Sequence, residues 1–209
     1  MIPQLRFSVV GASAELYAAV PTISFDLRIE AAGEQQISSI LLDIQLQIAA
    51  RQRGYEAAEQ DRLLELFGSP ERWASTLRTL PWLRTTLVVP PFSGSTEIKL
   101  PVQCSYDLEV AGARYFAALE DGEVPVELLF SGSVFYTGPQ GMLQTSRIGL
   151  DQEVDYRLPV AVWRQAIDRH FPASAWLRLG TESFNRLSAY KARGAFASWD
   201  AAVDSLLAE

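Results

Sequence analysis

The chain has 209 residues, of which 18 are basic and 25 acidic, so its formal net charge is −7 at pH 7. Nucleic-acid binding requires clustered lysine and arginine, and this balance argues against that function and against binding to an anionic membrane. No apolar run approaches the roughly 18 residues of a membrane-spanning helix, and the N-terminus does not resemble a secretory signal. With one cysteine, Cys104, we expect a cytoplasmic protein without membrane insertion.

The first quarter of the chain predicts β-structure. Apolar and polar residues alternate over residues 5–9, 22–30 and 40–48, which indicates strands with one buried face. The segment from Glu15 to Pro21 breaks this alternation, and we interpret it as an irregular entry to the second strand. The predicted inward-facing residues of the second and third strands are Ile23, Phe25, Leu27, Ile29, Ile40, Leu42, Ile44, Leu46 and Ile48.

The period then changes to helical spacing over residues 55–67. Gly68 suits the left-handed conformation that often ends a helix. Ser69 followed by Pro70 predicts the N-cap and first position of a second, short helix. We therefore expect a helical insertion over about residues 56–80, after the third strand.

Further strands follow, with a short helical segment among them. Pro101 interrupts one long alternation, and because proline cannot donate to a strand ladder, that strand should be bulged or at a sheet edge. The segment 124–136 is richest in apolar residues and is predicted to be a central strand. Residues 111–119 are predicted to form one or two helical turns. The predicted strands cover residues 85–89, 98–110, 124–136, 143–148 and 154–160.

The last third is predicted to be helical. Val160, Trp163 and Ile167 have helical spacing, Thr181 is a predicted N-cap, and Ser198 precedes a final apolar stripe. The predicted fold is α+β: an antiparallel β-sandwich of about seven to nine strands, with the helical insertion and three C-terminal helices. We expect a single domain over residues 1–209, with the sandwich over 1–160 and a helical segment over 161–209 packed on it.

Few residues offer catalytic chemistry. A Ser-His-Asp triad would have to use His170, the only histidine, and no Gly-x-Ser-x-Gly motif occurs. One cysteine and one histidine cannot complete a zinc site without carboxylates, and Cys104 is expected to be buried and inert. Asp107 and Glu109 form a weak candidate for paired-carboxylate catalysis. We therefore expect no catalytic, cofactor-binding or metal-binding residues.

Asp151, Glu153 and Asp155 alternate and should share one strand face. Two interpretations stay open for them. Their oxygens suit calcium at a sandwich rim, which also needs a glycine-containing loop and several carbonyl ligands. Alternatively, they form a solvated edge that discourages pairing between sheets, which we favour.

Aromatic and basic side chains in the helical C-terminal third suggest a surface for a protein partner, because such residues often anchor interfaces. The candidate interaction surface consists of Trp163, His170, Trp176, Arg178 and Trp199. The apolar stripe from Trp199 to Leu207 either packs on the protein's own sheet or on a second copy. A homo-oligomer therefore remains open.

Several strings resemble an uncharacterised bacterial family, a domain of unknown function whose members are typically encoded beside actinobacterial-type nickel–iron hydrogenase genes. The resemblance extends over nearly the whole chain. It implies a gene context and no activity, and it supplies no catalytic residues. The strings run from Tyr17 to Thr22, Leu66 to Gly68, Cys104 to Val110, Asp121 to Pro125, Leu129 to Ser133, Tyr156 to Trp163, Phe171 to Pro172, and Trp176 to Leu179.

The leading hypothesis is a non-enzymatic cytoplasmic accessory protein that binds a protein partner. The resemblance implies a partner among nickel–iron hydrogenase proteins or their maturation and assembly factors. The alternative is a small-molecule or lipid-binding β-sandwich with a pocket between the sheets and the C-terminal helices. A hydrolase using Asp107, Glu109 or His170 is the least expected function.

Overall fold

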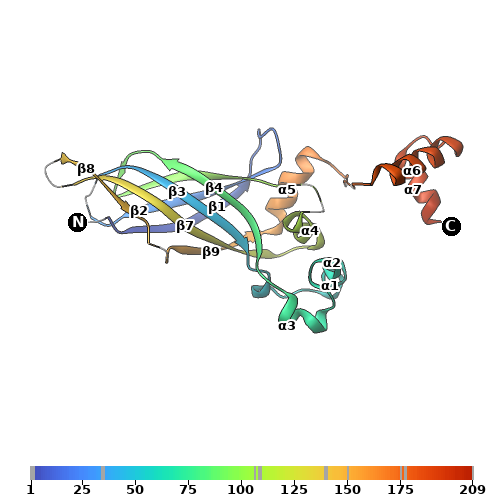
Figure 1. Ribbon diagram of the computed structural model, residues 1–209, viewed down its shortest axis with the longest axis horizontal. Coiled ribbons are helices and arrows are strands. Elements are labelled where there is room, and N and C mark those ends of the chain that lie inside the picture. The colour runs from blue at the N-terminus through green and yellow to red at the C-terminus, as the bar shows by residue number, and fades with distance from the viewer. Residues whose placement is uncertain are drawn as a thin grey trace. The chain divides into compact units, whose positions relative to one another are not determined.

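The computed structural model describes residues 3–33, 36–105, 107, 110–138, 141–149, 151–174, 176 and 178–208. The chain divides into two compact units, Met1–Ala175 (unit 1) and Trp176–Glu209 (unit 2). Unit 1 contains two antiparallel sheets with helices, and unit 2 contains a pair of helices (Figure 1). The predicted mixture of antiparallel sheets and helices is confirmed.

The smaller sheet has three strands, β1 (Leu5–Ala14), β2 (Thr22–Ala31) and β6 (Ser95–Gln103), in the order β1-β2-β6. The inward side chains of β2, from Ile23 to Ile29, are fully buried. β6 ends the order, as expected for a strand that contains Pro101, which pairs with Ser24 of β2.

The strand predicted to run to Val110 is shorter than expected. β6 ends at Gln103, and the chain turns because the backbone N–H of Asp107 donates to Ser105 Oγ and that of Val110 donates to the Asp107 carbonyl. These local hydrogen bonds compete with continuation of the ladder. Tyr106, Leu108 and Glu109 lie outside the described residues.

The larger sheet has the order β4-β3-β7-β8, with β5 on β3 and β9 on β7. β7 pairs on both sides, which confirms its predicted central position. Its Gly132 has a φ of +133°, and a Cβ there would clash with the carbonyl oxygen of Leu41 on β3. The strand bounds are β3 Gln36–Ile48, β4 Leu80–Val89, β5 Phe92–Ser93, β7 Glu123–Thr137, β8 Leu143–Arg147 and β9 Glu153–Pro159.

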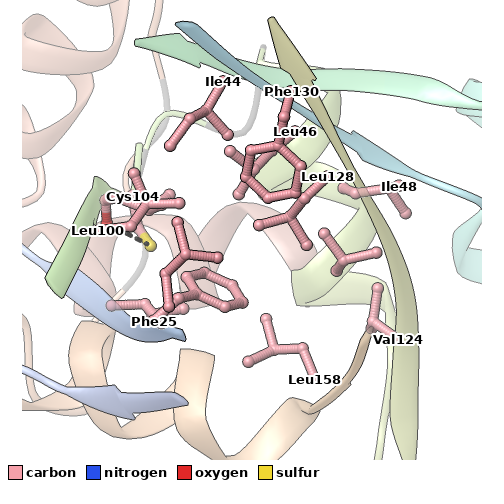
Figure 2. Packing of buried hydrophobic residues seen from close by; sticks show 14 of the residues in the cluster. Phe25, Ile44, Leu46, Ile48, Leu100, Cys104, Val124, Leu128, Phe130 and Leu158 are labelled. Atoms are coloured by element: carbon pink, nitrogen blue, oxygen red, sulfur yellow. Dashed lines mark hydrogen bonds between the residues drawn. The ribbon is translucent and has the colours of Figure 1, made fainter. Parts of the chain in front are cut away.

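The inner faces of the two sheets contribute to one hydrophobic cluster. Figure 2 shows Phe25 and Leu100 of the smaller sheet in the same packed interior as Leu46 and Leu128 of the larger one. The rings of Phe7 and Phe130 also join the sheets, stacked with centroids 4.4 Å apart. Each fully buried side chain of this size stabilises the fold by roughly 1.5–3 kcal/mol.

Short helices follow β3, where the sequence predicted the insertion. Instead of one helix over 55–67, two helices meet at the buried Leu63. Gly68 ends the second with a φ of +72°, and Ser69 and Pro70 begin the next, as their residue types indicated. The bounds are η1 Ala50–Gln52, α1 Ala57–Arg62, α2 Leu64–Phe67, η2 Pro70–Arg72 and α3 Trp73–Thr76.

Two longer helices, α4 (Ala111–Ala118) and α5 (Val160–His170), lie at the end of the sheets opposite β8 (Figure 1). Phe116 of α4 stacks on Trp163 of α5 with ring centroids 5.4 Å apart. α5 therefore belongs to unit 1, although the sequence pattern grouped it with the C-terminal helical segment.

Unit 2 consists of α6 (Thr181–Arg193) and α7 (Trp199–Leu207). Gly180, not Thr181, is the N-cap of α6, whereas Ser198 caps α7 as expected by accepting a hydrogen bond from the Ala201 N–H at 3.0 Å. Among the described residues, no helix is both long and apolar enough to cross a membrane.

Candidate functional site

A short exposed loop joins β1 to β2, and we call its residues, Glu15 to Pro21, the Tyr17 loop. The loop is tied down where it leaves and enters the strands. The Glu15 N–H donates to the Thr22 carbonyl at 2.9 Å, and the Thr22 hydroxyl donates to the Val20 carbonyl at 2.8 Å. The Pro21 carbonyl accepts from the Cys104 N–H at 2.8 Å. The loop is therefore held at both ends by backbone and side-chain bonds.

His170, at the end of α5, supports the middle of this loop. Its Nε2 lies 2.9 Å from the Ala18 carbonyl oxygen, and its Nδ1 lies 3.0 Å from the Ala166 carbonyl oxygen. A neutral imidazole can donate through only one nitrogen, whereas the protonated ring can donate to both carbonyls. A general base needs a ring nitrogen that reaches the substrate, and both nitrogens of His170 already face carbonyl groups. The structure thus gives His170 a positioning role for the Tyr17 loop.

The loop presents apolar side chains to solvent. Tyr17 is 94% exposed, and Leu16 and Val20 beside it are also exposed. A groove of about 690 Å³ adjoins the loop, with walls from β4 and β6 that include Leu83, Thr85, Pro101 and Gln103. An exposed aromatic ring on a fixed loop, beside an apolar groove, can anchor a binding partner at little cost in ordering.

This site was not predicted from the sequence, because residues 15–21 indicated only an irregular entry to the second strand. A signal was present. Leu16, Tyr17 and Val20 are large apolar residues in a short connection, outside the alternation that assigns buried faces.

A buried ion pair is a second place where titratable groups converge. Arg53 contacts Glu59 through two hydrogen bonds of 2.7 and 2.9 Å, and the Glu59 side chain is only 3% exposed. Burial alone would raise the pKa of Glu59, but the Arg53 hydrogen bonds and the backbone N–H of Glu120 outweigh it and lower that pKa. Arg53 also donates to the Asp121 carbonyl at 2.6 Å.

Two tyrosines complete this cluster. The hydroxyls of Tyr55 and Tyr115 lie 2.8 Å apart, and Tyr55 donates to the Ala50 carbonyl at 2.7 Å. Burial is the main cause that raises the pKa of both tyrosines. The polar groups of Arg53, Glu59 and the tyrosines have partners within the protein, so the cluster joins the helical insertion to α4 and to the start of β7.

The residues predicted to form an interaction surface divide between the two units. Trp163 is 6% exposed and packs on Phe116 in the core of unit 1, so its ring is not at the surface. His170 is half-buried in unit 1. Trp176, Arg178 and Trp199 belong to unit 2, where the rings of Trp176 and Trp199 are exposed.

The alternating acids lie on and before β9. Glu153 and Asp155 are exposed on β9, and Asp151 precedes the strand. Within the described part of the chain, no group of three or more potential metal-ligating side chains is close enough to hold an ion. Burial, followed by the charges of Asp155 and Glu153, raises the pKa of Glu127 on the neighbouring β7.

The remaining candidates are Cys104, Asp107 and Glu109. Cys104 is buried, and its burial raises the pKa of the thiol to about 12, so the reactive thiolate is disfavoured. Asp107 is exposed in the turn after β6, and Glu109 lies outside the described residues. The structure therefore does not show the acid pair that the sequence placed on one strand face.

The fold defines a protein of mixed α and β structure with antiparallel sheets and an exposed loop beside a groove. The chain belongs to a family of unknown function (DUF6084), whose model matches residues 2–209. The expectation that the chain belongs to a family of unknown function is confirmed. No curated protein matches the chain.

Solved structures give only weak likenesses. One, a Bordetella pertussis protein provisionally named ApaA, is 10% identical with a TM-score of 0.29, covering 75% of this chain and 93% of that one. A β-glucosidase 3B from Thermotoga neapolitana is 11% identical with a TM-score of 0.27, covering 74% of this chain and 17% of that one. A β-glucosidase from Kluyveromyces marxianus is 11% identical with a TM-score of 0.26, covering 74% and 15%. Scores this low carry no conclusion about function.

Proposed function

We propose that the protein is a non-enzymatic, cytoplasmic accessory protein that binds a protein partner through the Tyr17 loop. The observation that carries this proposal is the Tyr17 ring, which is 94% exposed on a loop fixed by hydrogen bonds at both ends and by His170. Aromatic residues of this kind are enriched among the few residues that dominate binding energy. We leave Trp163 out of the proposed surface because it is buried.

The groove beside the loop extends this surface. Its apolar wall residues, Leu83 and Pro101, come from β4 and β6, and Thr85 and Gln103 of the same strands add hydrogen-bonding groups. An apolar anchor with a polar surround is the usual composition of a protein interface. The resemblance noted for the sequence makes nickel–iron hydrogenase maturation and assembly proteins the first candidates as partners.

Affinity purification of the tagged full chain from its native host tests the proposal. We expect the wild type to recover a partner, and Tyr17→Ser to recover it at least tenfold less, because the anchoring ring is lost. Leu143→Ser is the matched control. Leu143 is an exposed apolar residue on β8, at the opposite end of the sheets from α5 (Figure 1), and its loss should not change recovery.

Recovery of the wild type alone under gentle conditions would contradict the proposal, as would equal recovery of the partner with Tyr17→Ser. A deletion of the gene, followed by measurement of hydrogenase activity in the cells, tests the proposed kind of partner separately. Unchanged hydrogenase activity would remove those proteins from the candidates without affecting the proposed surface.

Binding of a small molecule or lipid is the second candidate, because a groove of about 690 Å³ falls within the usual size of a ligand site. The space between the two sheets is filled by packed side chains, including the fully buried Ile44 and Leu46, so the candidate ligand site is the groove beside the Tyr17 loop. Native mass spectrometry of the gently purified protein separates the two functions. A retained small molecule that is displaced by Thr85→Trp would favour this second function.

A further inference from the structure

The two helices of unit 2 bury very little of their apolar surface. They are held together by contacts such as the 2.8 Å hydrogen bond between the hydroxyls of Tyr190 and Ser205 and the packing of Phe184 on Trp199. Among the described residues of this unit, only Ala202 is buried. The unit is also shorter than the roughly 40 residues below which a domain usually needs oligomerisation or cross-links. The exposed apolar side chains of unit 2 therefore offer a surface that a second protein surface can cover.

A groove of about 650 Å³ runs along these helices. Leu179, Leu187 and Leu206 make it apolar, and Arg186 and Arg193 supply positive charge. On α7, Val203 and Leu207 are exposed, with Leu207 81% accessible. The same helical pair thus presents both an apolar groove and projecting apolar side chains that could fill such a groove.

The charges of the two helices are complementary. α6 carries three basic residues and one acidic residue, whereas α7 carries Asp200 and Asp204 and no basic residue. Within the described part of the chain, neither these two aspartates nor Arg186 and Arg193 form an ion pair. A surface with opposite charges on adjacent helices can pair with itself, because a twofold axis repeats every contact.

We propose that this surface binds a second copy of the same chain, in a twofold dimer in which α6 of each copy lies against α7 of the other. Val203 and Leu207 of one copy enter the groove of the other, and Asp200 and Asp204 face Arg186 and Arg193 across the interface. The residues of this interface are different from those of the Tyr17 loop. A dimer would therefore present two such loops, which strengthens binding to a partner that has two sites.

Sedimentation velocity of the full chain at micromolar concentrations tests this proposal. We expect the wild type to be a dimer. Two double variants reverse the charge of one helix each: Asp200→Arg with Asp204→Arg on α7, and Arg186→Asp with Arg193→Asp on α6. Each should weaken self-association at least tenfold, because like charges then meet across the interface. Mixing the two double variants in equal amounts should restore a dimer, since each α6 then faces an α7 of opposite charge.

The control is Arg72→Asp with Arg84→Asp, which makes the same change in net charge as Arg186→Asp with Arg193→Asp, but at exposed positions of unit 1, and should leave the dimer intact. Circular dichroism shows whether each variant is folded. A monomeric wild type, a dimer that tolerates both charge reversals, or a mixture of folded variants that does not associate would each overturn the proposal. Tyr17→Ser should remain dimeric, and its dissociation would place the interface at the loop instead.

Discussion

The two units of this chain differ in how far their apolar side chains are buried. In unit 1, the inward residues of β2, β3 and β7 are almost completely removed from water and form one cluster. In unit 2, Phe184, Trp199, Val203, Leu206 and Leu207 all remain exposed. Burial within unit 1 stabilises its fold, whereas the exposed apolar area of unit 2 stabilises nothing until another surface covers it. Substitutions of apolar residues in unit 1 should therefore change mainly the stability of the fold, and those in unit 2 mainly association.

Truncation of a leucine in each unit gives the largest contrast. Leu46→Ala should lower the free energy of unfolding of unit 1 by about 3–5 kcal/mol, because it leaves a cavity among fully buried side chains. Leu207→Ala should change the free energy of unfolding of unit 1 by less than about 0.5 kcal/mol, because Leu207 belongs to unit 2 and is 81% exposed within its own chain. Urea unfolding followed by fluorescence measures both, and equal losses would contradict the contrast.

Loss of the ion pair between Arg53 and Glu59 in unit 1 should lower the free energy of unfolding nearly as much as loss of a core leucine. Glu59→Ala leaves Arg53, whose side chain is only 11% exposed, without its carboxylate partner and should lower the free energy of unfolding by about 3 kcal/mol. The matched control is Glu97→Ala, which breaks the exposed pair with Arg28 and should cost less than about 1 kcal/mol. Similar losses in the two variants would show that burial does not decide the contribution of these ion pairs.

Gly132 tests the close contact between β7 and β3. Gly132→Ala should destabilise unit 1 by about 2 kcal/mol, because the new Cβ meets the Leu41 carbonyl and the positive φ disfavours alanine. Gly94→Ala is the control, since Gly94 also has a positive φ, of +70°, but a Cβ added there would have no neighbouring atom within 4 Å. Thermal unfolding should therefore separate the steric contact from the backbone strain.

The pH dependence of stability should give the smallest effects, with opposite signs at two glutamates. The pKa of Glu59 is lowered on folding. Its contribution to the free energy of unfolding is therefore complete above pH 4.5, the usual pKa of the group, and is lost as the pH falls through the folded pKa. The pKa of Glu127 is raised, so its contribution is present below 4.5 and is lost as the pH rises through the folded pKa.

The dependence of the free energy of unfolding on pH can be measured by urea unfolding between about pH 7 and pH 3. The proteins to compare are the wild type, Glu59→Gln and Glu127→Gln. The advantage of the wild type over Glu59→Gln should shrink on acidification. Relative to Glu127→Gln, the wild type should instead gain stability on acidification, because the pKa of Glu127 is raised. Slopes of the same sign would contradict the two pKa directions.

Local patterns in the sequence determined much of the secondary structure. Alternation located the buried faces of β2 and β3 because side chains on a strand point to opposite sides in turn. Gly68 and Ser198 marked helix ends because their backbone and side-chain preferences act over only a few residues. Such signals depend on neighbours in the sequence and can be read without a structure.

The tertiary structure decided what depends on distant residues. The stacking of Trp163 on Phe116 removed it from the predicted surface, and the turn at Ser105 and Asp107 ended β6 early. His170, far along the sequence, contacts Ala18 and helps to hold the Tyr17 loop, and no local pattern in the sequence indicates this contact. By itself the sequence determined which faces are apolar. Only the packing of the chain decided which of those faces are covered, because burial depends on contacts between segments that are remote in sequence.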